Sequence, residues 1–244
     1  MADERPRIFP ASKRLFDLFV TLALAPGWIV VLLLCAAAQL AFEGLPVLYT
    51  SSRRVHGSKV ITILKFRTLR RDADKLFNRE TVPVDRQRFL NISADSPLYT
   101  PTGRLIERTM LTELPQVLHV LRGHMSLVGN RPLPLNVVEA LREQHPDVDL
   151  RFRAPAGLTG PVQLVGRDDL SDTQRLALEY AYVARVAHAS AVLLDLKILA
   201  LTVAAGLSSR WRLTYQQALE LVALPSDATE SANPGASLPG KPHS

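Results

Sequence analysis

The stretch LFVTLALAPGWIVVLLLCAAAQLAF, residues 18–42, contains 25 consecutive residues without a charged side chain. A helix needs about 20 apolar residues to cross a bilayer, so this run is long enough for membrane insertion. A buried helix of a soluble core is rarely so long and apolar on every side. A cleaved signal peptide is also disfavoured, because Pro26-Gly27 interrupts the run and no small-x-small site precedes Glu43. The run therefore predicts a membrane segment.

The break at Pro26 and the charges around the run bear on its topology. Proline interrupts a helix, which leaves two arms, Leu15–Ala25 and Trp28–Phe42, each expected to be too short to cross alone. A spanning helix usually carries its excess of Lys and Arg on one flank, whereas here both flanks are basic. The basic residues are Arg5, Arg7, Lys13 and Arg14 before the run, and Arg53, Arg54 and Lys59 after it. We therefore expect a re-entrant hairpin that enters and leaves the cytoplasmic leaflet, rather than a span.

Around this segment the chain divides into three predicted parts. Residues 1–44 hold the membrane segment, residues 45–222 form a cytoplasmic domain, and residues 223–244 are expected to be disordered because they are poor in apolar residues. Together they predict an α+β fold. We expect a small mixed core, the re-entrant membrane helix hairpin and amphipathic membrane-associated helices.

Periodicity within the domain predicts its individual elements. Alternating residues over 45–71 predict strands with a turn at His56-Gly57, and 72–103 reads as irregular with a short helix near Asp72–Phe77. The stretch after residue 151 reads as a loop. Helices are predicted over the following ranges: 111–121, Ser171 or Asp172 to His188, 191–207, and 215–224.

Charge and cysteine content limit the classes of partner. The chain has 29 Lys and Arg against 23 Asp and Glu, and its pI of about 9.8 favours a lipid surface, a phosphorylated substrate or nucleic acid. Nucleic acid is the weakest of the three, because aromatic residues are only 6% and do not alternate with the basic ones. The single Cys35 excludes an intrachain disulfide and fits a reducing, cytoplasmic setting.

Lys65 and Arg67 are the first candidate site residues. They alternate with Phe66 on a predicted strand, so both cations should face one side. Two cations on one face suit a diphosphate, and an arginine can bind phosphate through two donors at once. The alternative is a solvated strand face with Phe66 in the core.

Thr112, Glu113 and Arg131 are the other candidates. Pro115 favours a first helical turn, which places Thr112 near the N-cap and Glu113 beside the free amides. These residues could simply cap the helix and offset its dipole. The same helix end could instead bind phosphate, with Glu113 holding Mg²⁺. Arg131 lies on a rigid turn between Gly129 and Pro132, which suits a guanidinium aimed at a ligand.

Five segments, in this order, resemble the bacterial sugar transferase family, the monotopic polyprenyl-phosphate phosphoglycosyl transferases. They are KRLFDLF (13–19), KFRT (65–68), ELPQVLHVLRGHMSLVGNRPLP (113–134), RFRAPAGLTGPVQLVGR (151–167) and LLDLKILALT (193–202). The block at 113–134 is the most specific. GNRPLP and RFRAPAGLTG resemble the branch that primes capsule and exopolysaccharide synthesis.

The resemblance implies a reaction at the cytoplasmic face of the inner membrane. A UDP-sugar would give its sugar-1-phosphate to undecaprenyl phosphate, releasing UMP and making the first lipid-linked intermediate of a surface polysaccharide. In this family the Asp of an Asp-Glu pair attacks the phosphate nearest the sugar, and Mg²⁺ screens the diphosphate. The implied partners are a UDP-sugar, undecaprenyl phosphate and membrane lipid, with no nucleic acid.

Residue by residue, the resemblance implies substrate binding by Lys65, Arg108 and Arg131, and a catalytic and metal-binding role for Glu113. The strand pattern adds Arg67 to the expected substrate-binding residues. The position of the catalytic Asp holds Thr112, and Glu107 stands where a second Arg is common. A threonine hydroxyl must lose a proton to attack, so it needs a base in contact, and in the sequence Glu113 is the only near candidate.

Thr112 leaves three alternatives. In the first, the lipid phosphate attacks the donor directly, with Glu113 as metal ligand or base, and in the second Glu113 is itself the nucleophile. In the third, the chain is a catalytically silent membrane homologue that serves glycan synthesis as a binding or assembly subunit. The transferred sugar should be selected by the loops at Arg131–Asn136 and Ala156–Gln163. The apolar stripe over 191–207 suits either the membrane or a homodimer.

Overall fold

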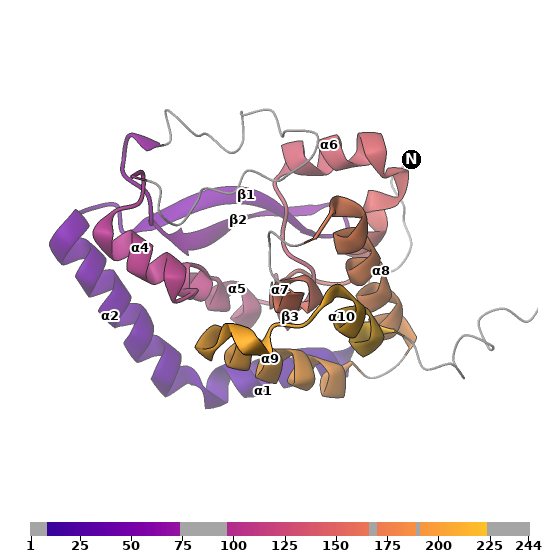
Figure 1. Ribbon diagram of the computed structural model, residues 1–244. Coiled ribbons are helices and arrows are strands. Elements are labelled where there is room, and N and C mark those ends of the chain that lie inside the picture. Colours follow the sequence, from indigo (N-terminus) through magenta and orange to yellow (C-terminus); the bar gives the residue numbers. More distant parts are fainter. Residues whose placement is uncertain (1–8, 74–96, 166–169, 189–190, 224–244) are drawn as a thin grey trace, which may run out of the picture.

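The computed structural model describes residues 9–73, 97–165, 170–188 and 191–223 of the 244-residue chain. Two small sheets and surrounding helices confirm the predicted α+β class (Figure 1). The predictions for residues 74–96 and for the tail after residue 223 lie outside the described residues.

The apolar run forms two helices that meet at a bend. Helix α1 spans Ala11–Ala23 and α2 spans Ala25–Glu43, with the break at Leu24 rather than at Pro26. Pro26 lies in the first turn of α2, where its missing amide proton costs no hydrogen bond. With its 19 residues, α2 is the one helix of the described ranges that is long and apolar enough to cross a membrane. The prediction that neither arm could cross alone is therefore wrong for α2.

One face of α1 is buried against the domain, and polar residues form that face. Lys13, Asp17 and Thr21 recur every four residues and are all buried. The Lys13 Nζ donates to Asp195 Oδ2 at 2.5 Å and to the Val128 carbonyl at 2.8 Å, and Asp17 Oδ1 accepts from the Leu127 amide. These bonds join α1 to the domain.

The carboxyl end of α2 is joined to the same domain. The buried Gln39 Nε2 donates to the Arg67 carbonyl at 2.5 Å, and the Thr102 hydroxyl donates to the Glu43 carboxylate at 2.6 Å. Both ends of the helix pair thus contact one body. The side chains between them that stay largely exposed are apolar: Leu15, Phe19, Leu22, Leu24, Leu33, Leu34 and Phe42.

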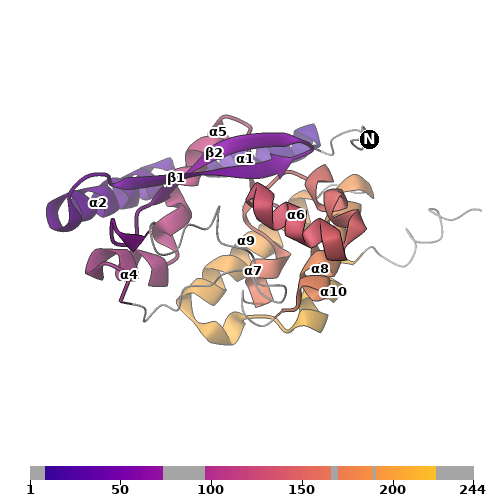
Figure 2. The ribbon, with the colours of Figure 1, turned by 90° about the horizontal axis from the view of Figure 1, so that it is seen from above.

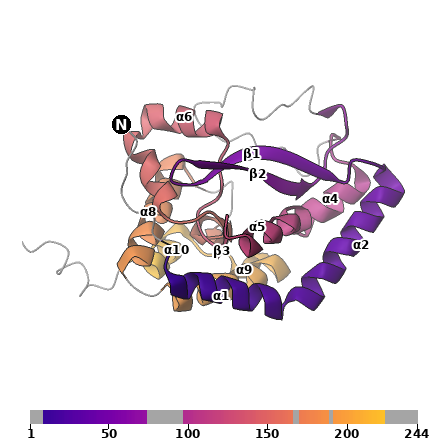
Figure 3. The same ribbon diagram turned by 180° about the vertical axis from the view of Figure 1, so that it is seen from behind.

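A long β-ribbon follows the helix pair. Strand β1, Leu48–His56, pairs antiparallel with β2, Lys59–Phe66, and Gly57 in the connecting turn has a φ of 50°. This confirms the predicted strands and turn. Seen from behind in Figure 3, the ribbon and α1 lie at opposite edges, with α2 at one end and α5 between them.

The segment that follows at residue 100 carries the predicted site. Helix α4 spans Pro101–Arg108, the 3₁₀ helix η1 spans Leu111–Gln116, and α5 spans Val117–Leu121. Met110 joins α4 to η1 in the left-handed conformation, with a φ of 58°. It is also the N-cap of η1, so the predicted capping role of Thr112 is wrong.

A second, two-stranded sheet lies in the core. Strand β3, Ser126–Val128, pairs parallel with β4, Gly157–Thr159. This pairing brings Gly129 so close that a Cβ on Gly157 would lie 2.1 Å from its nitrogen. The stretch predicted as a loop after residue 151 therefore contains a strand and a short helix, α7, spanning Pro161–Val165.

Helices complete the domain. They are α6, Leu135–Gln144; η2, Pro146–Arg153; α8, Asp172–His188; α9, Val192–Leu207; η3, Ser209–Trp211; and α10, Tyr215–Val222. The last helices confirm the predicted ones to within two residues. Figure 2 shows α7, α8, α9 and α10 on one side of the ribbon and of the α1–α2 pair. The outer face of α9 is mostly apolar, with Leu193, Leu196, Val203 and Leu207 exposed beside a single cation, Lys197.

Candidate active site

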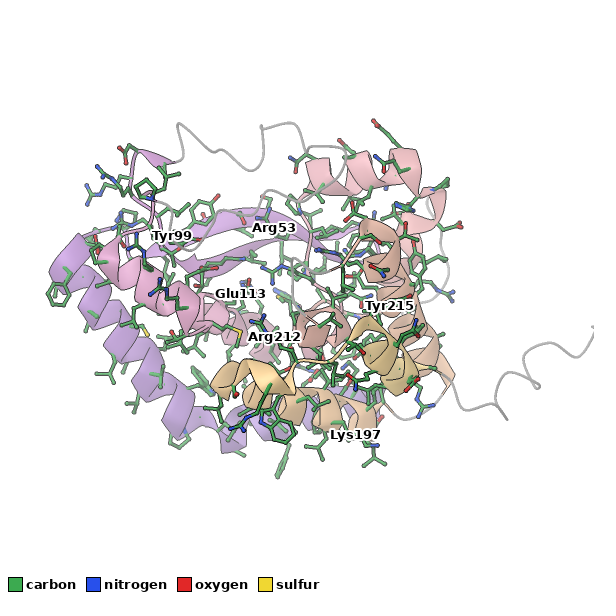
Figure 4. All side chains as sticks on the ribbon, viewed as in Figure 1. Arg53, Tyr99, Glu113, Lys197, Arg212 and Tyr215 are labelled. Carbon is green, nitrogen blue, oxygen red and sulfur yellow. The ribbon has the colours of Figure 1, made fainter. Side chains whose placement is uncertain are left out.

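Glu113 lies between two cations that come from distant parts of the chain. Its Oε1 accepts from Lys65 Nζ at 2.9 Å and from Arg131 Nη2 at 2.5 Å, and its Oε2 accepts from Arg131 Nη1 at 3.2 Å. All three side chains are mostly buried, with 14% to 21% exposed. Figure 4 places Glu113 inside the domain, between the β-ribbon and α9. The structure therefore brings together three of the predicted site residues.

Each of these residues is positioned by a regular element. Lys65 is the penultimate residue of β2, and η1 carries Glu113 against that strand. Arg131 follows β3, and its carbonyl accepts from Arg151 Nη2 at 2.9 Å. Arg151 is held in turn by two hydrogen bonds to the Glu179 carboxylate, in a fully buried ion pair.

Sequence reasoning missed the Arg151–Glu179 pair. A usable signal was present, because Glu179 lies on the same stripe of α8 as Leu176, Val183 and Val186, which are all buried. An acid on an apolar helix face needs a buried partner. The pair fixes the backbone at Arg131, which makes it a positioning element of the site.

Burial, and to a smaller extent the neighbouring charges, change the pKa of Lys65. Burial lowers the pKa of Lys65 to about 8, although the nearby Glu113 carboxylate opposes this change. Arg131 and Arg53, which are both close by, lower that pKa further. Arg53 is a third cation of the site that the sequence did not single out, and Figure 4 shows it on the ribbon above Glu113. Such a cluster attracts an anion with several charges.

The donor set fits a magnesium ion that is shared with a substrate. Mg²⁺ binds proteins through one or two carboxylates and completes its shell with water and substrate phosphates. The described residues contain no group of three or more His, Cys, Asp or Glu side chains that could hold a metal by themselves. Glu113 would be the protein ligand. Binding there would release Lys65 and Arg131 toward a diphosphate.

Arg67 binds backbone carbonyls rather than Glu113, and the predicted substrate-binding role of Arg108 stays a prediction. Strand β2 ends at Phe66, so the alternation that should have aligned Arg67 with Lys65 stops there. The Arg67 guanidinium instead donates to the carbonyls of Pro46, Glu43 and Gly44 and fastens the end of α2. Arg108 is the last residue of α4 and is exposed.

Thr112 contacts a carboxylate that sequence reasoning did not consider as its partner. The Thr112 hydroxyl donates to Glu107 Oε2 at 2.8 Å. Glu113 was expected to be the only near base, and that expectation is wrong. The contact depends on the reversal of the chain at Met110, which no periodicity in the sequence indicates.

The low pKa of Lys65 predicts a pH dependence of diphosphate binding. Lys65 is cationic below about pH 8 and loses its proton as the pH rises through that value. The affinity for UDP should therefore fall by about tenfold from about pH 7 to about pH 9, the loss expected for one charge-assisted hydrogen bond. Isothermal titration of wild type and Lys65→Arg measures this, because an arginine stays charged throughout.

The exposed Lys197 on α9 supplies the control. Lys197→Arg should keep the wild-type fall in affinity. An equal fall in Lys65→Arg would show that another group causes the pH dependence.

Known proteins resemble this chain over most of its length. Residues 8–209 match the family model described as bacterial sugar transferase. The chain is 34% identical over 191 residues to the sugar transferase EpsL of Bacillus subtilis (strain 168), covering 78% of this chain and 85% of that protein. It is 31% identical over 180 residues to the exopolysaccharide production protein ExoY of Sinorhizobium fredii, covering 70% and 76%.

A longer relative matches over about a third of its own length. The undecaprenyl-phosphate glucose phosphotransferase of Komagataeibacter xylinus is 35% identical over 214 residues, which are 82% of this chain and 36% of that protein. The family match covers most of the chain and includes Lys65, Glu113 and Arg131. The chain belongs to the bacterial sugar transferase family.

Proposed function

We propose that the protein transfers sugar-1-phosphate from a UDP-sugar to undecaprenyl phosphate at the cytoplasmic face of the membrane, and so primes the synthesis of a surface polysaccharide. The observation that carries this proposal is Glu113 held between Lys65 and Arg131 in a member of the family. Two relatives are named exopolysaccharide production proteins, which supports a role in the synthesis of a surface polysaccharide.

The cations around Glu113 support a nucleotide diphosphate as donor. Arg131 binds the two carboxylate oxygens through two nitrogens, and the same geometry fits a phosphate group. When bound, Mg²⁺ would draw negative charge from the diphosphate and stabilise the departing UMP. A relative in Erwinia amylovora is named a UDP-galactose-lipid carrier transferase, which supports a uridine nucleotide.

An apolar cavity at the bend between α1 and α2 supports the lipid acceptor. Its volume is about 360 Å³, and its lining residues are Val20, Thr21, Leu24, Gly27, Trp28, Val117 and Leu127. Val117 begins α5, four residues after Glu113, so cavity and site share one continuous segment. We assign the first isoprene units of undecaprenyl phosphate to this cavity. The exposed apolar face of α9 would rest on the lipid surface, and its use in a homodimer stays a prediction.

The attachment of both ends of the helix pair supports re-entrant topology. Lys13 near the start of α1 and Gln39 near the end of α2 are bonded to the same domain. A straight span would separate such ends by about 30 Å of hydrocarbon. The bend at Leu24 lets the chain enter the bilayer and return, although α2 alone has the length to cross.

Thr112 supports one alternative function, that of a silent membrane subunit that binds substrates or assembly partners. This alternative requires no turnover by the wild-type protein. It also allows turnover to appear in Thr112→Asp, which would supply a nucleophilic carboxylate.

The decisive measurement is UMP release by the purified protein with Mg²⁺, undecaprenyl phosphate and a panel of UDP-sugars. We expect turnover by wild type and its loss when Mg²⁺ is chelated. Glu113→Gln and Lys65→Ala should lower kcat/KM by about 10²- to 10³-fold, as for other groups that stabilise transition-state charge. The exposed Glu139→Gln on α6 is the matched control and should retain activity. Turnover by Thr112→Asp alone would select the silent subunit.

Gly27→Leu tests the lipid cavity. A Cβ at Gly27, which lines the cavity, would meet no atom within 4 Å, so there is space to begin a larger side chain there, and leucine has better helix propensity than glycine. We expect the KM for undecaprenyl phosphate to rise by about tenfold, from the loss of a few buried methylenes, while the KM for the UDP-sugar is unchanged. Gly27→Ala leaves most of the space and should behave as wild type. An unchanged lipid KM in Gly27→Leu would place the acceptor elsewhere.

Topology can be tested by cysteine labelling in a Cys35→Ser background. Ser12→Cys and Leu45→Cys introduce exposed thiols on either side of the helix pair. Both should react with a membrane-impermeant maleimide in inside-out vesicles, and neither in right-side-out vesicles. Leu33→Cys, in the middle of α2, should react in neither. Labelling of Ser12→Cys and Leu45→Cys from opposite sides would establish a span.

A further inference from the structure

The contact between Thr112 and Glu107 has the geometry of an activated nucleophile. The Thr112 Oγ1 donates to Glu107 Oε2 at 2.8 Å, within the range of 2.6 to about 3.2 Å that joins nucleophile and base in known sites. Both side chains are half-buried, and Thr112 directly precedes Glu113 in η1. A hydroxyl with a carboxylate in contact therefore lies one residue before Glu113, in the same 3₁₀ helix.

The backbone holds this contact in place. Helix α4 ends at Arg108, and Met110 then turns the chain back with φ 58° and ψ 16°, a conformation uncommon for residues other than glycine. At its other end α4 is packed tightly on the chain after β2, since a Cβ on Gly103 would lie 2.1 Å from the Thr68 carbonyl oxygen. The packing thus holds α4, which carries Glu107, and the turn at Met110 holds η1, which carries Thr112.

The two carboxylates near Thr112 have different surroundings. Glu113 is engaged by Lys65 and Arg131, which compensate its charge. In the described ranges, the Glu107 carboxylate forms no ion pair and accepts the hydroxyl of Thr112. Glu107 is thus the carboxylate in contact with the Thr112 hydroxyl, whereas Glu113 is occupied by the two cations.

We propose that Thr112 is the nucleophile of the transfer and that Glu107 is its general base. The proposal rests on the function proposed above. The Thr112 oxygen forms a bond to the phosphorus nearest the sugar while the bond from that phosphorus to the bridging oxygen breaks. UMP departs with the bridging oxygen and its electron pair. The hydroxyl proton passes to Glu107, and a threonine–phosphate–sugar diester results.

The second half of the reaction needs the same proton. The phosphate oxygen of undecaprenyl phosphate attacks the phosphorus of the diester, and the bond to the Thr112 oxygen breaks. A carboxylate nucleophile leaves as a stable anion, whereas threonine would leave as a strongly basic alkoxide. Glu107 therefore returns its proton to Thr112 as the bond breaks. The pair ends in its starting state, which makes Glu107 necessary in both steps.

Variants separate this mechanism from direct attack by the lipid. In the UMP-release measurement, Thr112→Val and Glu107→Gln should each lower kcat by about 10²- to 10⁴-fold, which is the usual contribution of general base catalysis. Thr112→Ser keeps a hydroxyl and should retain much of the activity. Thr109→Val is the matched control, because the Thr109 hydroxyl donates to backbone carbonyls of α4 and should not affect the rate. Retained UDP binding by the inactive variants shows that they are folded.

The chemistry of the adduct gives a second readout. Wild type with Mg²⁺ and the UDP-sugar, but without lipid, should gain the mass of one sugar phosphate on the peptide that contains Thr112. A phosphodiester survives neutral hydroxylamine, whereas the acyl phosphate formed by a carboxylate nucleophile is cleaved. Addition of undecaprenyl phosphate should remove the adduct and form the lipid-linked product.

The outcomes distinguish this proposal from the function on which it rests. Absence of UMP release by wild type overturns the proposed function and this mechanism together. Turnover that persists in Thr112→Val or in Glu107→Gln overturns this mechanism alone, as does an adduct that hydroxylamine removes. Loss of turnover in both variants, with activity in Thr112→Ser and Thr109→Val, supports it.

Discussion

The buried ion pair between Lys13 and Asp195 is the interaction on which the arrangement of the molecule depends. Both side chains are fully excluded from solvent, so their charges are stable only as a pair with further hydrogen bonds. Tyr182 supplies such bonds to both charges, and the Val128 carbonyl accepts from the lysine. Removal of one charge would leave the other buried and unpaired, which costs about 3 to 5 kcal/mol in proteins. The pair thereby fixes α1, which leads into the membrane segment, against α9.

The same bonds connect the membrane segment to the site. Lys13 and Asp17 both bind the backbone of β3, at Val128 and Leu127. Three residues beyond Val128 the chain reaches Arg131, whose backbone is held from the other side by Arg151. The short strand β3 thus binds α1 on one side and leads into the residue whose guanidinium contacts Glu113. In the proposed function, the same strand therefore positions both the lipid phosphate and the diphosphate.

Sequence patterns predicted the elements that follow from local periodicity and the site residues that lie in motifs. They did not predict contacts that depend on how the chain turns in space. The β-ribbon and the C-terminal helices follow from alternation and from apolar stripes, and Lys65, Glu113 and Arg131 follow from three separate motifs. The role assigned to Arg67 assumed that β2 continues past Phe66. The strand at Gly157–Thr159 forms because the backbones of Gly129 and Gly157 approach closely. A glycine-rich composition by itself predicts a loop. The partner of Thr112 depends on one left-handed residue, Met110.

An uncharged nucleophile changes the electrostatic problem of this reaction. An aspartate at position 112 would bring a second negative charge beside Glu113 and toward an anionic diphosphate, and cations must compensate that repulsion. In the proposed mechanism, Thr112 approaches the phosphorus as a neutral group and becomes negative only while its proton moves to Glu107. In the proposed mechanism the two carboxylates therefore divide the work, with Glu113 among the cations and Glu107 beside the hydroxyl. In that mechanism the two residues depend on each other, because Glu107 supplies the base that the Thr112 hydroxyl needs.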